Sequence, residues 1–93
     1  MSKVIKVEFE DETHIYLKQL KAGEREVIDD QESVNKKGHY IVLYMYCRED
    51  GKQIYKNIDE VREKCDDDLW YFIVNYSYDM RTSKKKIDSP EKK

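Results

Sequence analysis

The 93-residue sequence is poor in the residues that cross-link or break a chain, with two cysteines, three glycines and one proline. Two cysteines do not make the disulfide framework of a small secreted domain, and neither Cys47 nor Cys65 lies in a cluster with zinc-ligand spacing. We therefore expect reduced thiols in the core rather than a disulfide or a reactive thiol. No apolar run approaches the ~20 residues of a membrane span, and residues 1–10 lack the apolar stretch of a signal peptide. These absences predict a soluble, cytoplasmic protein with no membrane partner.

Motifs for catalysis, metals and nucleotides are missing as well. His14 and His39 have no partner motif, and no Ser/His/Asp or Cys/His arrangement follows from residue spacing. The acidic run at residues 66–68 lacks the DxDxDG spacing that places oxygens around calcium, and residues 21–38 contain no Gly-rich phosphate cradle. We therefore expect a protein that is not an enzyme and that needs no cofactor or metal.

Charge is what the sequence has in excess. Charged residues make up 41% of the chain against ~25% in an average domain, while 39% hydrophobic residues are enough for one small core. Residues 81–93 hold six basic and two acidic residues, a net charge of +4, so residues 1–80 carry −6 and the whole chain −2. The composition predicts one compact α+β domain over residues 1–80 and a basic, disordered tail over residues 81–93. An acidic body of this kind repels a phosphate backbone.

Two apolar runs are rich in aromatic and β-branched residues, at residues 39–47 (HYIVLYMYC) and 69–78 (LWYFIVNYSY). Short continuous runs of these residue types between charges and turn residues are typical of buried strands, so we expect both to be central strands of one sheet. Alternation along the strands would then collect most of the rings on one face. The residues predicted for this aromatic face are Tyr40, Val42, Tyr44, Tyr46, Tyr55, Trp70, Phe72, Val74, Tyr76 and Tyr78.

The N-terminal segment predicts a hairpin. Apolar and charged side chains alternate over residues 3–10, and the pattern resumes after residue 13. A loop at residues 11–13 would place Phe9 opposite Ile15, with the apolar sets of both strands on one face. A helix over residues 12–22 is the main alternative.

A second hairpin is predicted after the first aromatic run. The Asp50-Gly51 pair is the preferred sequence of a two-residue type I′ turn, which would place Cys47 beside Ile54.

One helix is expected over residues 58–66, where Asn57 is a good N-cap and apolar residues form a one-sided stripe. A short strand near residues 26–28 is expected in the polar connection that precedes the first aromatic run. Together these elements predict an α+β fold, with a mostly antiparallel sheet of four to five strands and one helix packed on one face.

The aromatic face then needs a cover. The N-terminal hairpin could pack on it, a second copy could cover it in a homodimer, or the rings could bind a partner. The leading hypothesis is a small protein-binding module, an adaptor, regulator or inhibitor, of a composition that suits a bacterial or phage accessory protein. The alternative is a single-stranded nucleic-acid-binding domain that stacks bases on the rings and tracks phosphates with the lysine tail. The predicted partner-binding residues are Tyr44, Tyr46, Tyr55, Trp70 and Tyr76, together with Asp66, Asp67 and Asp68.

Overall fold

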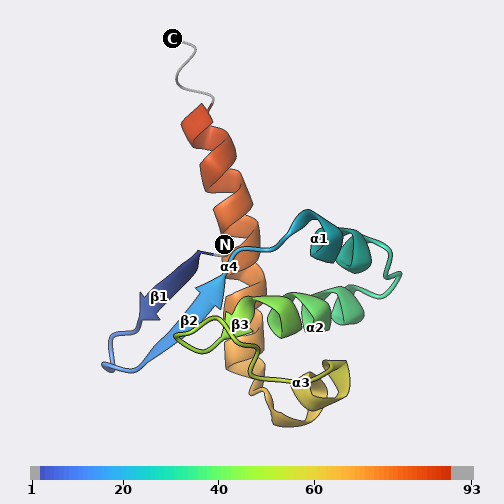
Figure 1. The fold of residues 1–93 in the computed structure, drawn as a ribbon, viewed down its shortest axis with the longest axis horizontal. Helices are drawn as coiled ribbons and strands as arrows, with labels where there is room; N and C mark the ends of the chain where they lie inside the picture. Colours follow the sequence, from blue (N-terminus) through green and yellow to red (C-terminus); the bar gives the residue numbers. More distant parts are fainter. Residues whose placement is uncertain (1–2, 89–93) are drawn as a thin grey trace.

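The computed structural model describes residues 3–88, with side chains as far as Met80, and these residues form an α+β fold of three strands and four helices. The strands make one antiparallel sheet in the order β1-β2-β3. The longest element, α4 (Asp67–Asp88), extends past the sheet and the other helices (Figure 1). The expected fold, a sheet of four to five strands with one helix, is therefore wrong.

Both aromatic runs form helices instead of central strands. The first lies mostly in α2 (Val34–Met45) and the second lies inside α4. The prediction failed because every second position of an almost wholly apolar run is apolar, so the strand period of 2 cannot be told from the helix period of 3.6. The helical period is visible in the burial of α2, where Gly38, Ile41, Val42 and Met45 are buried at helical spacing and Leu43 is buried beside them.

The N-terminal hairpin is confirmed with a shifted register. β1 (Val4–Glu8) pairs antiparallel with β2 (His14–Lys18), and Val7 lies opposite Ile15 in place of Phe9. A shift of two residues keeps every side chain on its face, so the apolar side of the hairpin is as expected. β3 (Tyr46–Cys47) pairs with the other edge of β2. The helix considered over residues 12–22 is wrong.

The connection after β3 is a hairpin loop of three residues, not two. Cys47 pairs with Gln53, one residue short of the predicted partner. The Arg48 N–H donates to the Lys52 carbonyl at 2.9 Å, which closes the loop. Gly51 ends the loop with a φ of +89°, a conformation that glycine adopts without the steric cost of a Cβ.

Helix α1 (Ala22–Asp29) occupies the position of the short strand expected at residues 26–28, and that prediction is wrong. Ile28 is the one buried residue of this helix, and its side chain joins the core. Two adjacent apolar residues, Val27 and Ile28, are too few to show whether apolar positions repeat with the period of a strand or of a helix.

Helix α3 (Ile58–Lys64) confirms the predicted helix. The Asn57 side chain accepts a hydrogen bond from the Glu60 N–H at 3.0 Å, as an N-cap should. Val61 faces the core at 1% exposure.

The core collects side chains from every layer around α2. Leu17 of β2, Ile28 of α1, Ile41 of α2, Val61 of α3 and Ile73 of α4 are all at most 1% exposed. Among residues 3–88, no helix combines the length and the apolar character needed to cross a membrane.

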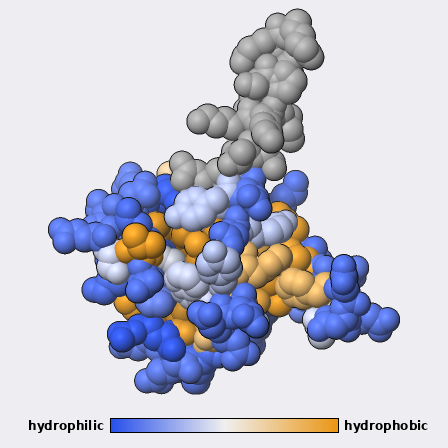
Figure 2. Space-filling model, turned by 180° about the vertical axis from the view of Figure 1, so that it is seen from behind, coloured by the Kyte–Doolittle hydropathy of each residue, from blue (hydrophilic) through white to orange (hydrophobic). Residues whose placement is uncertain are grey.

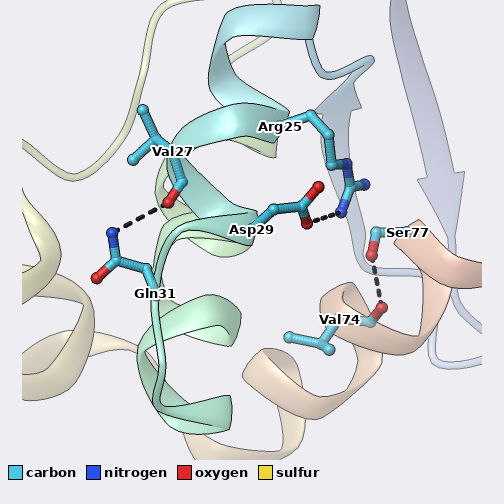
Figure 3. A network of polar contacts seen from close by, with 6 residues as sticks. All are labelled: Arg25, Val27, Asp29, Gln31, Val74 and Ser77. Carbon is cyan, nitrogen blue, oxygen red and sulfur yellow. Dashed lines mark hydrogen bonds and ion pairs between the residues drawn. The ribbon is translucent and has the colours of Figure 1, made fainter.

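Local hydrogen bonds satisfy polar groups where α1 and α4 meet the core (Figure 3). The Gln31 side chain donates to the Val27 carbonyl at 3.0 Å, beyond the end of α1. The buried Ser77 hydroxyl donates to the Val74 carbonyl of its own helix at 2.7 Å, so it enters the core without an unpaired donor.

The predicted tail at residues 81–93 overlaps the end of α4, which continues to Asp88, and residues 89–93 lie outside the described residues. A disordered tail stays a prediction.

Candidate functional site

The five predicted aromatic site residues do not share a sheet face, because both runs that hold most of them are helices. Tyr55 is only 9% exposed and packs against Tyr46, with ring centroids 5.7 Å apart. Burial raises the pKa of Tyr55 to about 12 and also raises the pKa of Tyr46. Tyr44 stacks on Tyr40 one turn earlier in α2, with centroids 5.9 Å apart. These rings are arranged as separate packed pairs.

Trp70 belongs to the packing between α2 and α4. Its indole Nε1–H donates to His39 Nδ1 at 3.0 Å, and the ring lies against Gly38. Burial, and secondarily the positive charge of Arg62, lowers the pKa of His39. The neutral imidazole with Nδ1 as acceptor is therefore the form that holds this hydrogen bond.

The three predicted aspartates line a cleft with residues that are distant in sequence. Asp66, Asp67 and Asp68 lie at the start of α4, and the β1–β2 loop approaches from the other side. The cleft is open to solvent and has a volume of about 550 Å³. Both of its sides lie toward the lower end of the molecule in Figure 1. The full lining is Phe9, Asp11, Thr13, Asp66, Asp67, Asp68, Leu69 and Phe72.

The loop side of the cleft holds a fixed carboxylate. Asp11 accepts two hydrogen bonds from Thr13, at 3.0 Å from the backbone N–H and 2.6 Å from the hydroxyl. These bonds lower the pKa of Asp11, because they stabilise the ionised form. A backbone hydrogen bond closes the β1–β2 loop, in which the Phe9 N–H donates to the Thr13 carbonyl at 2.9 Å. Asp11 is therefore ionised and oriented before any ligand arrives.

The floor of the cleft is apolar. Phe9 meets Phe72 edge to face, with ring centroids 5.1 Å apart, and Leu69 lies one turn before Phe72 on α4. Tyr76 packs against Phe72, with ring centroids 5.7 Å apart, and is the one predicted aromatic site residue that contacts the lining of the cleft. The Phe9–Phe72 contact joins the β1–β2 loop to α4.

The charge of the cleft is uncompensated by its own lining, which contains four aspartates and no basic residue. Among residues 3–80, ion pairs form elsewhere, and none uses a cleft aspartate. No group of three or more histidine, cysteine or acidic side chains in this part of the chain is placed to hold a metal ion. The cleft can therefore attract a cationic group and offer it an apolar surface.

Sequence reasoning included the aspartates but missed Phe9, Leu69 and Phe72 as parts of a site. A signal that points toward them is the acidic run around Asp11, but nothing in the sequence places this run near residue 66. Comparisons with protein-family models, with curated proteins and with solved structures found no match to this chain.

Proposed function

We propose that the chain is a small, non-enzymatic protein-binding module that takes a basic segment of a partner protein into the acidic cleft. The observation that carries the proposal is the mixed lining, in which four aspartates lie beside two phenylalanines and a leucine. A segment with a lysine or arginine next to a large apolar side chain would match both parts. The chain would then serve as an adaptor, regulator or inhibitor of the protein that holds the segment.

The two parts of the lining would contribute in different ways. The carboxylates would steer a cationic segment toward the cleft and make association fall with salt. Burial of an apolar side chain against Phe9 and Phe72 would supply affinity, at ~25 cal/mol per Å² of apolar surface removed from water. A volume of about 550 Å³ falls in the ~300–1,000 Å³ range of ligand pockets, which suits a few residues of a peptide.

Affinity capture with matched variants tests this proposal. The cleft variant is Asp67→Asn with Asp68→Asn, which removes two charges and keeps the side-chain shapes. The control is Asp30→Asn with Glu32→Gln, which removes two exposed acids from the α1–α2 connection, on the side of the molecule away from the β1–β2 loop (Figure 1). Each protein is used as bait at low and high salt, and recovered proteins are identified by mass spectrometry.

We expect a specific protein that the wild type and the control recover at low salt and that the cleft variant recovers at least ~10-fold less, a loss of ~1.4 kcal/mol. A partner bound equally by both variants would contradict the role of the cleft. Recovery of no specific protein at either salt concentration would contradict the proposed function. A change in Trp70 fluorescence or in anisotropy with single-stranded oligonucleotides would instead support the nucleic-acid alternative.

A further inference from the structure

A hydrogen bond between a histidine and a tryptophan crosses the packing of α2 on α4. The indole Nε1–H of Trp70 donates to His39 Nδ1 at 3.0 Å, and the two rings meet edge to face with centroids 5.8 Å apart. Both side chains are half-buried, and both helices bury aliphatic side chains in the core, Ile41 and Ile73 among them. Seen from behind (Figure 2), pale and orange side chains run down the middle of the molecule between strongly polar ones. The bond is therefore a polar contact at the margin of an apolar core.

This hydrogen bond exists in only one protonation state of the histidine. A neutral imidazole can accept at Nδ1 when Nε2 carries the proton, whereas both nitrogens of an imidazolium are donors. Protonation of His39 at Nδ1 would therefore set two N–H groups against each other, and the Trp70 indole would lose its acceptor.

The charges around the histidine do not compensate an imidazolium. The elements packed on α2 are α1, α3, α4 and the strands β2 and β3, and from them the positive charge of Arg62 in α3 acts on His39. Burial, and then this charge, lowers the pKa of His39. No carboxylate of residues 3–80 forms an ion pair with the imidazole. A protonated His39 is thus more stable where water can reach it, away from its place beside the indole.

The tryptophan belongs to the turn that carries one wall of the acidic cleft. Its backbone N–H donates to the Asp66 carbonyl at 2.9 Å, in the first turn of α4. Leu69 precedes it in the chain and Phe72 follows two residues later, and both line the cleft. A movement of the indole away from α2 would therefore move the backbone that holds these two side chains.

We propose that the His39–Trp70 hydrogen bond is a pH-sensitive latch, in which protonation of His39 frees the indole and shifts the first turn of α4, changing the shape of the acidic cleft. The latch is closed when His39 is neutral and opens in mild acid. It is defined by residues of the chain alone. Release of a bound segment in mild acid would follow from it, and this consequence alone rests on the proposed function of the cleft.

Nuclear magnetic resonance titration of the unliganded chain between pH 8 and 5 tests the latch. The signals followed are the His39 ring, the Trp70 indole N–H, and the backbone amides of Leu69 and Phe72. Aspartates with an ordinary pKa of ~3.9 stay largely ionised over this range. Two variants alter the latch: His39→Gln removes the titrating group, and Trp70→Phe keeps an aromatic ring but removes the N–H.

The control variant is His14→Gln, which removes the other histidine of the chain and leaves the latch intact. His14 lies in β2, where its ring meets Tyr16 edge to face. Circular dichroism at pH 7.5 checks that each variant keeps its helix content.

We expect the indole N–H and the two cleft amides to change together, with the midpoint of the His39 ring and below pH 6.5. These changes should be absent in His39→Gln and should persist in His14→Gln. Trp70→Phe should raise the midpoint of His39 by about half a pH unit to one unit, because the neutral imidazole loses a hydrogen bond.

Four results would overturn the proposal: a His39 ring that stays neutral down to pH 5, an indole signal that ignores its titration, cleft amides that titrate equally in His39→Gln, or an unchanged His39 midpoint in Trp70→Phe. None of these measurements uses a ligand. Failure of the latch would therefore leave partner capture by the cleft unaffected, and failure of partner capture would leave the latch intact.

Discussion

Replacing Gly38 by alanine should destabilise the protein, although the same change stabilises most helices. Gly→Ala in a helix interior usually contributes ~0.5–1 kcal/mol, mainly because glycine leaves the unfolded chain more freedom. At position 38 the added Cβ would fall on Trp70 Cζ2, with Cη2 at 2.8 Å and Cε2 at 2.9 Å, closer than Cβ atoms come to other groups. Overpacking of this kind costs ~1–3 kcal/mol, so we expect a net loss of ~0.5–2 kcal/mol.

A double-mutant cycle isolates the cause of this loss. In a Trp70→Ala background the obstructing ring is absent, and Gly38→Ala should become stabilising by ~0.5–1 kcal/mol. Urea unfolding followed by far-ultraviolet circular dichroism measures all four proteins. Gly23→Ala is the matched control, because nothing lies within 4 Å of the added Cβ in α1. If Gly38→Ala stabilised the wild type, or had the same effect in both backgrounds, the packing of α2 on α4 would be refuted.

Three further predictions concern single residues. Trp70→Ala should cost ~2–4 kcal/mol, because a half-buried ring and its hydrogen bond to His39 are lost, and a melting temperature within a degree or two of wild type would contradict this. Gly51→Ala should cost ~1 kcal/mol in urea unfolding through its φ of +89°, and no loss would mean that the loop relaxes to another turn. Because burial and then Arg62 lower the folded-state pKa of His39, the unfolded chain binds its proton more readily. The stability contribution of His39 should be complete above ~6.5 and decline as the pH falls from there toward the lowered pKa, and unfolding curves of wild type and His39→Gln should diverge in that window.

Local signals predicted the elements that depend on local interactions. The hairpin follows from alternation of polar and apolar residues, which only a half-buried strand requires. Helix α3 follows from the Asn57 cap and its one-sided apolar stripe, both of which the structure contains. These features are set within a few residues, so tertiary context did not override them.

The aromatic runs could not be assigned in the same way. Residues 39–47 are apolar at almost every position, so their period is hidden, and β-branched and aromatic residues favour strands on propensity alone. The helical signal lies partly in the flanks, where Ser33 accepts a hydrogen bond from the Lys36 N–H at 3.3 Å and begins α2. Gly38 weakens a helix assignment based on propensity alone. Its place in α2 is explained by its contact with the Trp70 ring, which comes from a distant segment of the chain.

The candidate site was predictable only in part. The acidic residues are visible in the sequence, but the cleft exists because the β1–β2 loop meets the start of α4, across more than fifty residues of chain. No local sequence pattern indicates that the β1–β2 loop and the start of α4 lie side by side. The apolar floor was missed for the same reason, since Phe9 and Phe72 become neighbours only when the β1–β2 loop meets α4.

The most direct measurement is an amide chemical-shift map of the isotopically labelled chain, titrated with a short peptide that alternates arginine and lysine with leucine and phenylalanine. We expect saturable shifts confined to the β1–β2 loop and to the first turns of α4, around Asp11 and Leu69. The shifts should disappear in Asp67→Asn with Asp68→Asn and persist in Asp30→Asn with Glu32→Gln. Shifts centred instead on Tyr44 and Tyr55, shifts spread evenly over the acidic surface, or equal binding by both variants would contradict the assignment of the cleft as the binding site.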